Sequence, residues 1–218
     1  MTRAAAFFDL DGTLLTVNSA RLWIRRERRL GRATVHQVAL AVACMAAYRI
    51  GVLDIEGALR AALATIRGLD ERFIRSETEE WWREVRRFAA PGARAVLRAH
   101  RDRGEPLVLL TSSSRYAAEL ARDEFGLDAV LFQGYEVRDG RFTGEPLRPF
   151  CYGPGKVAKA AAWARESGVA LDESSFYTDS STDVPMLERV RHPRIVNPDL
   201  RLRLVARSRG WPILDWHG

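Results

Sequence analysis

The 218-residue sequence has few cysteines and no long hydrophobic segment. Its two cysteines, Cys44 and Cys151, are far apart and fall in no metal-ligand spacing, so we expect free thiols and no disulfide. The longest apolar run, 38–48, is shorter than the roughly 20 residues needed to cross a bilayer and predicts a buried helix. The first residues lack a signal-peptide pattern, which predicts a cytoplasmic protein without stable membrane insertion.

Lysine is also scarce, because Lys156 and Lys159 are the only lysines among 34 basic residues. The net charge of +6 would suit nucleic acid, an acidic membrane surface or an anionic substrate. No recognised nucleic-acid-binding motif accompanies the arginine clusters, such as Arg21–Arg32. We therefore interpret these clusters as solvated helix faces and expect no nucleic-acid partner, whereas the sequence carries no signal for the oligomeric state.

Short apolar runs alternate with helical patterns along much of the chain. Five runs predict parallel strands, the last of them more weakly: Ala4–Phe8, Leu107–Leu110, Ala129–Phe132, Ser175–Thr178 and Arg194–Val196. Helices are predicted between them at Gly92–Arg103, Arg115–Phe125 and Val157–Ser167, and a hairpin at Tyr135–Gly144. This alternation predicts an α/β fold, a three-layer Rossmann-like core with a parallel sheet.

The segment Ser19–Ala90 interrupts that alternation. It contains three or four helical stretches and no convincing strand, and Pro91 and Gly92 punctuate its end. We therefore expect a helical insertion at 19–90 after the first strand, carried by a core formed from 1–18 and 91–218.

Polar and charged residues gather just beyond the predicted strands. In an open α/β sheet, ligands bind beyond the carboxyl ends of the strands. The residues in such positions are Asp9, Asp11, Thr111, Ser112, Lys156, Asp179 and Asp183. We therefore expect four acids, hydroxyl groups and a lysine to converge on one edge of the sheet.

This set of side chains has a chemical logic. Neighbouring carboxylates repel one another unless a cation neutralises them, and hard oxygen ligands suit Mg²⁺. With a metal and a lysine absorbing charge, one carboxylate can attack phosphorus and form an aspartyl-phosphate. A second carboxylate can protonate the leaving oxygen and later activate water. One member of the Asp9–Asp11 pair would then be the nucleophile and the other the acid/base.

Each of these features has a structural explanation when taken alone. An Asp-x-Asp pair is common in surface turns, the serines at 112–114 could cap a helix, and Lys156 could be a surface lysine. The positions of these residues favour function, because each falls at a predicted strand-to-loop junction or at the start of the helix that follows the hairpin. The Asp9–Asp11 pair also follows an apolar strand, where unpaired charges are costly.

Four segments, in this order, resemble the motifs of the haloacid dehalogenase superfamily of phosphatases. They are "FFDLDGTLL", "LVLLTSSS", "GPGKV" and "FYTDSSTDVPML", which together span Phe7 to Leu187. The helical insertion is similar to the cap of the phosphoserine-phosphatase-like branch. The tail "RIVNPDLRLRLVARSRGWPILDW" is similar to the bacterial hydrolases of subfamily IB.

The resemblance implies a role for each residue of the set. It makes Asp9 the nucleophile, Asp11 the general acid/base and Lys156 the catalytic cation that holds the nucleophile and the phosphate charge. Substrate contacts would come from Thr111, Ser112 and the backbone at Gly12. Mg²⁺ would be held by Asp9, the backbone carbonyl of Asp11 and Asp179, with Asp183 orienting the metal's shell or a water.

The resemblance implies hydrolysis of a small phosphorylated substrate, with two alternatives. One is a phosphotransferase that uses the same intermediate, and the other is a non-catalytic phosphate-binding regulatory protein. The cap would decide the substrate. In phosphoserine phosphatases, an acid nine residues beyond the nucleophile helps to bind the substrate's amino group, whereas this sequence has Asn18 there. We therefore expect phosphoserine to be a poor substrate.

Overall fold

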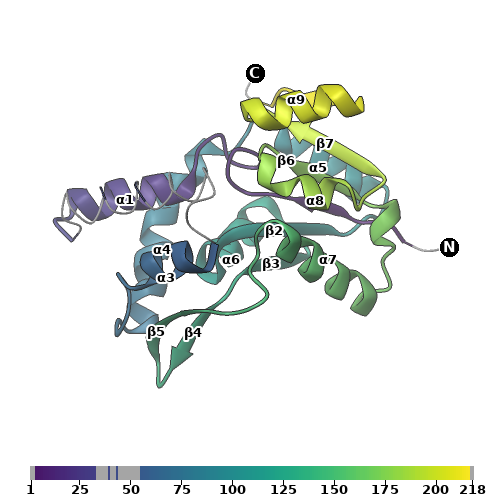
Figure 1. Ribbon diagram of the computed structural model, residues 1–218. Helices are drawn as coiled ribbons and strands as arrows, with labels where there is room; N and C mark the ends of the chain where they lie inside the picture. The colour runs from purple at the N-terminus through teal and green to yellow at the C-terminus, as the bar shows by residue number, and fades with distance from the viewer. Residues whose placement is uncertain (1–2, 33–38, 40–42, 44–54, 217–218) are drawn as a thin grey trace.

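The computed structural model describes residues 3–32, 39, 43 and 55–216 (Figure 1). Its centre is a six-stranded sheet in the order β3-β2-β1-β6-β7-β8, and every neighbouring pair is parallel. The strands are β1 (Ala6–Phe8), β2 (Leu107–Ser114), β3 (Ala129–Gln133), β6 (Ser175–Thr178), β7 (His192–Val196) and β8 (Ile213–Leu214). The predicted α/β fold with a parallel sheet is confirmed. Of the helix predicted at 38–48, the structure describes only residues 39 and 43, and both are helical.

Both faces of the sheet are buried, because successive side chains of a strand point to opposite sides. In β1, Ala6 and Phe8 pack into one hydrophobic cluster and Phe7 into another, and all three are fully buried. Helices α5 (Ala93–Asp102) and α6 (Arg115–Phe125) cover the first face. Helices α7 (Pro154–Glu166), α8 (Val184–Leu187) and α9 (Leu200–Arg209) cover the second. The sheet and its two helical layers form the predicted three-layer core.

Three helices and a 3₁₀ turn follow β1 within the described part of the inserted segment. They are α1 (Ser19–Arg29), α3 (Ile55–Leu63), α4 (Glu71–Val85) and η1 (Arg86–Phe88). Figure 1 shows α1 projecting away from the sheet. Trp81 and Trp82 of α4 are buried in the cluster on the α5–α6 side of the sheet. Most of their surface is therefore used in packing.

The predicted hairpin is confirmed as β4 (Tyr135–Arg138) and β5 (Arg141–Pro146). Its two turn residues, Asp139 and Gly140, both have positive φ, as the tight turn requires. The hairpin also pairs with the connection between α3 and α4. Phe142 accepts a hydrogen bond from the backbone N–H of Gly68 at 2.8 Å and donates one to the carbonyl of Leu69 at 3.0 Å. The hairpin is thus attached to the inserted helices.

The carboxyl-terminal part of the fold differs most from the sequence prediction. The weak fifth strand is β7, two residues longer than predicted because it begins at His192-Pro193, a pair with no strand pattern. Strand β8 was not predicted, since two residues are too few to show an alternating pattern. Two more 3₁₀ turns, η2 (Leu171–Glu173) and η3 (Ser181–Asp183), flank β6. Among the described helices, none has the length and apolar character needed to span a bilayer.

Candidate active site

Asp9 stands at the carboxyl end of β1, the third strand in from one edge of the sheet. Its backbone N–H donates to the carbonyl of Tyr177 in β6 at 2.9 Å, so the parallel pairing continues up to Asp9. Strands β2 and β6 flank β1. Thr111 lies within β2, two residues beyond the partner of Phe8, and Asp179 directly follows β6. The sheet therefore brings the residues predicted after three separate strands to one edge.

Lys156 supplies a buried positive charge to this edge. It lies in the first turn of α7 and is 1% exposed. Its Nζ donates to Oδ2 of Asp183 at 2.7 Å and lies 3.1 Å from Oδ1 of Asp9. Burial disfavours the charge, but Asp183 and Asp9 outweigh this effect and raise the pKa of Lys156. The lysine therefore stays protonated between the two carboxylates.

Asp183 is held from two sides. Besides Lys156, the hydroxyl of Thr178 donates to its Oδ2 at 2.7 Å. Its Oδ1 is buried and has no hydrogen-bond partner within the described part of the chain. Sequence reasoning did not single out Thr178, although it precedes the fourth motif's first acid. Lys156 and Thr178 thus fix the Asp183 carboxylate and leave one of its oxygens available.

Asp9 and Asp179 hold their protons more strongly than ordinary carboxyl groups. Burial and the nearby Asp183 and Asp11 raise the pKa of Asp9 to about 7, although Lys156 opposes the rise. Burial, Asp9 and Asp183 raise the pKa of Asp179 to about 8. Perturbed carboxylates of this kind are typical of catalytic and metal-binding sites. The site therefore has more negative charge than its one buried lysine neutralises.

Asp11 forms its hydrogen bonds with Ser19, the first residue of α1. Its Oδ1 accepts a hydrogen bond from the backbone N–H of Ser19, and its Oδ2 accepts one from the Ser19 hydroxyl, both at 3.0 Å. Burial raises the pKa of Asp11, although these two bonds oppose the rise. A raised pKa favours the protonated form of a carboxyl group, which is the form that a general acid uses. Sequence reasoning used Ser19 only to mark the start of the insertion and missed this contact.

Gly12 allows the two acidic loops to approach. It has a φ of +71°, and a Cβ at this position would lie 2.1 Å from Oδ2 of Asp179. Any side chain would therefore be strained and would collide with the Asp179 carboxylate. Because Gly12 has no side chain, the Asp179 carboxylate has room to lie against the turn that follows Asp9.

Thr111 and Ser112 lie within β2 and not beyond it as predicted, because the strand continues to Ser114, four residues past its predicted end. Thr111 is buried, and its Oγ1 accepts a hydrogen bond from the backbone N–H of Ser113 at 3.1 Å. Ser112 is exposed, and its hydroxyl donates to the carbonyl of Cys151 at 2.9 Å. The Thr111 hydroxyl still has a proton to donate, whereas that of Ser112 is directed to the segment before α7.

The acidic residues fit a magnesium ion. Within the described ranges, no group of three or more His, Cys, Asp or Glu side chains forms a closed metal cluster. Mg²⁺ does not need one, because it commonly takes one or two protein carboxylates and completes its shell with water and phosphate oxygens. Asp9 and Asp179 repel each other, a repulsion that a cation would relieve, and Asp183 adds an unpartnered buried oxygen. The donor set therefore suits a hard, partly hydrated cation.

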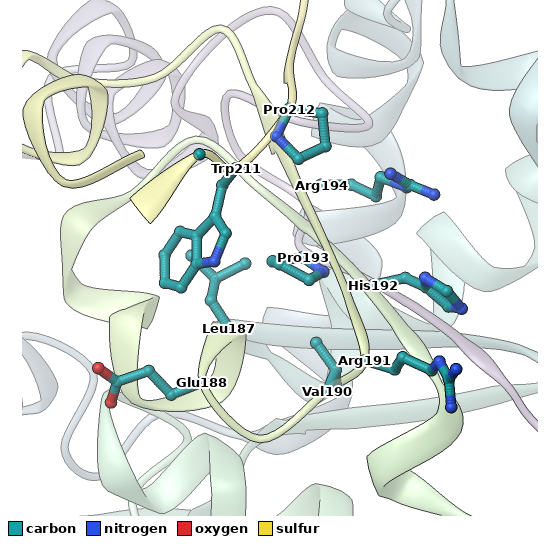
Figure 2. Close-up of a pocket in the computed structure, with 10 residues that line it drawn as sticks. Leu187, Glu188, Val190, Arg191, His192, Pro193, Arg194, Trp211 and Pro212 are labelled. Carbon is teal, nitrogen blue, oxygen red and sulfur yellow. The ribbon is translucent and has the colours of Figure 1, made fainter. Parts of the chain in front are cut away.

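A groove of about 490 Å³ lies at the opposite end of the sheet, where β7 begins. Figure 2 shows Leu187 and Trp211 on one side of the strand and His192 and Arg194 on the other. Ligands of parallel α/β sheets bind beyond the carboxyl ends of the strands, and His192 is the first residue of β7. This groove is therefore separate from the cluster around Asp9.

A buried lysine between two carboxylates, with further acids at the same edge of a parallel sheet, is an arrangement suited to phosphoryl transfer. The model of the haloacid dehalogenase-like hydrolase family matches residues 6–188, which include every residue of this site. The chain belongs to that family and is an enzyme of its phosphatase type, as the four motifs predicted.

Named relatives align along almost the whole chain. Phosphoserine phosphatase SerB1 of Mycobacterium tuberculosis is 33% identical over 219 residues, covering 98% of this chain and 71% of that protein. Histidinol-phosphatase of Neisseria meningitidis is 28% identical over 221 residues, covering 97% of this chain and 98% of that protein. A crystal structure of a Bordetella pertussis protein of unknown function shares 33% identity with a TM-score of 0.89, covering 99% of this chain and 100% of that one.

Proposed function

We propose that this phosphatase hydrolyses a small phosphomonoester with the help of Mg²⁺, through an aspartyl-phosphate on Asp9. The observation that carries the proposal is the placement of Asp9. Its carboxylate ends a buried strand, lies 3.1 Å from a buried lysine and is close enough to Asp179 for the two charges to interact. A positive charge beside the carboxylate reduces its repulsion of an incoming phosphoryl group.

In the first step, a carboxylate oxygen of Asp9 attacks phosphorus and the bond from phosphorus to the leaving oxygen breaks. Asp11 gives its proton to that oxygen, so an alcohol departs. Lys156 forms an ion pair with Asp9 at 3.1 Å and can reach the phosphoryl oxygens. Asp183 accepts hydrogen bonds from both Lys156 and Thr178 and so keeps the lysine in place. Bound Mg²⁺ would neutralise charge on the phosphoryl oxygens, held by Asp9, Asp179 and the carbonyl of Asp11.

In the second step, the Asp11 carboxylate takes a proton from water as the water attacks the phosphorus of the aspartyl-phosphate. The acyl phosphate bond breaks, which releases inorganic phosphate and restores Asp9. The Ser19 hydrogen bonds keep Asp11 in the same position for both proton transfers. A second alcohol in place of water would make the same site a phosphotransferase.

The decisive variant is Asp9→Asn, which keeps the size of the side chain and removes the nucleophile. It should lower kcat for an aryl phosphate by several orders of magnitude while the circular dichroism spectrum is unchanged. The control is Asp102→Asn at the exposed end of α5. Acid-quenched wild-type enzyme should carry a phosphoryl group on Asp9, identified by mass spectrometry. Near-normal turnover by Asp9→Asn would refute the proposal.

Asp11→Asn tests the acid separately. A nitrophenolate leaves readily without a proton, whereas an alkoxide does not. If Asp11 protonates the leaving oxygen, Asp11→Asn should slow phosphorylation by an alkyl phosphate far more than by an aryl phosphate. Equal losses with both substrates would show that Asp11 has another role.

A further inference from the structure

Asp199 links the start of α9 to the loop that carries Asp179 and Asp183. Its backbone N–H donates to the carbonyl of Asp179 at 2.9 Å. Its Oδ2 accepts a hydrogen bond from the backbone N–H of Ser181 at 2.9 Å. Its Oδ1 accepts one from the backbone N–H of Leu202 at 2.7 Å. One residue therefore holds two points of the acidic loop and the first turn of a helix.

Helix capping accounts for only part of this arrangement. An N-cap side chain needs one oxygen to accept from the second or third helical N–H, and Oδ1 does this at Leu202. The other oxygen bonds an amide 18 residues earlier in the chain. A serine would cap α9 as well as aspartate does, but it has a single oxygen on a shorter side chain. The second contact is therefore a property of aspartate here that capping does not require.

The other hydrogen bonds of this loop are mostly local. The Ser180 N–H donates to the hydroxyl of Thr178, and the Asp183 N–H donates to the carbonyl of Ser180. Lys156 anchors the far end of the loop at Asp183. Asp199 anchors its beginning, where the Asp179 side chain must turn toward Gly12.

We propose that Asp199 is a positioning residue that fixes the 179–183 loop and thereby aims the Asp179 carboxylate at the turn after Asp9. The proposal rests on the magnesium-dependent function proposed above. Residues that orient metal ligands commonly change metal affinity or activity by about 10- to 100-fold when they are replaced. Asp199 is exposed, so its replacement leaves no buried cavity.

The test compares Asp199→Ser, which retains a helix cap, with Ala206→Gly, which weakens α9 at a buried site away from the loop. Mg²⁺ binding to the free protein is measured by calorimetry, and hydrogen exchange of the 179–183 segment by mass spectrometry. Asp199→Ser should weaken Mg²⁺ binding and lower kcat by about tenfold or more, and it should speed exchange of the segment. Ala206→Gly should leave all three unchanged.

The positioning role would be overturned if Asp199→Ser kept its kcat, its Mg²⁺ affinity and the exchange rate of the 179–183 segment within about twofold of wild type. Asp179→Asn separates this result from a failure of the proposed function. If Asp179→Asn binds Mg²⁺ as wild type does, the assigned metal ligand is wrong. In that case, the positioning role is judged from kcat and hydrogen exchange of Asp199→Ser without the Mg²⁺ affinity. A lower kcat together with faster exchange of the 179–183 segment supports the role, and wild-type values of both refute it.

Discussion

The ammonium group of Lys156 lies 2.7 Å from Oδ2 of Asp183, and the two side chains are only 2% and 1% exposed. Oδ1 of Asp9 lies 3.1 Å from the same ammonium. Removing one partner of a buried ion pair leaves an uncompensated charge and commonly costs about 3–5 kcal/mol. Lys156 therefore contributes both to the fold and to the charge balance of the site.

We predict that Lys156→Met abolishes turnover and lowers the free energy of unfolding by about 3 kcal/mol at about pH 8. The loss of stability should be smaller at about pH 5, because the pKa of Asp9 is raised and the carboxyl group is then mostly protonated. Urea unfolding at both pH values measures the effect. Lys159→Met, on the same helix and outside the site, is the control. Equal stability of the two variants would contradict the prediction.

The raised pKa values of Asp9 and Asp179 predict how stability depends on pH in chelator. Both groups bind protons more tightly in the folded protein than at the ordinary value of 3.8. The contribution of these two groups to stability is therefore greatest below 3.8 and is lost as the pH rises through about 7 and about 8. Asp179→Asn should make the metal-free protein more stable than wild type at about pH 9, with a much smaller difference at about pH 5. A difference in stability that does not change with pH would argue against charge repulsion between Asp179 and Asp9.

Buried His100 gives a pH dependence of the opposite sign. Its Nε2 lies 2.8 Å from the Tyr177 hydroxyl and its Nδ1 lies 2.5 Å from Oε2 of Glu105. Burial lowers the pKa of His100, although Glu105 opposes the shift. The unfolded chain then binds more protons, so this contribution to stability is lost as the pH falls below about 6.5. His100→Gln should flatten the fall in stability between about pH 6.5 and pH 5.

Thermal or urea unfolding across this range, at one ionic strength, measures the slope for His100→Gln. His192→Gln, at the exposed start of β7, is the control for replacing a histidine elsewhere in the chain. If His100→Gln and wild type lose stability in parallel, His100 does not titrate with folding.

Asn18 gives a prediction about the substrate. It is the N-cap of α1, and its Oδ1 accepts a hydrogen bond from the backbone N–H of Arg21 at 3.1 Å. A neutral amide used in this way cannot pair with an ammonium group of a substrate. We therefore predict that phosphoserine has a kcat/KM well below that of the best compound in a panel of small phosphomonoesters.

Asn18→Asp retains a good N-cap and adds a negative charge. It should raise kcat/KM for phosphoserine relative to that for para-nitrophenyl phosphate, which has no ammonium group. Should phosphoserine prove the best substrate of the wild-type enzyme, the interpretation of Asn18 would be wrong.

The sequence by itself determined the fold class and which residues gather in the candidate site. Apolar runs that end in Asp9, Thr111 and Asp179 indicate strands, and parallel strands bring their carboxyl ends to one edge. Three of the four motifs lie in or directly after strands that the topology places side by side, whereas the third, with Lys156, lies at the start of α7. The hairpin was also predictable, since Asp139-Gly140 favours a tight turn with positive φ.

The tertiary structure decided which partner each of these side chains has. Backbone groups take part in one of the two Asp11–Ser19 hydrogen bonds, in the hydrogen bonds between the acidic loop and Asp199 and in the pairing of Phe142 with Gly68. Every residue except proline offers the same backbone N–H and carbonyl, so no pattern of side chains indicates which of these groups will meet. Only the packed chain brings a given amide within hydrogen-bond distance of a given carboxylate, and with it sets the charge and direction of that carboxylate.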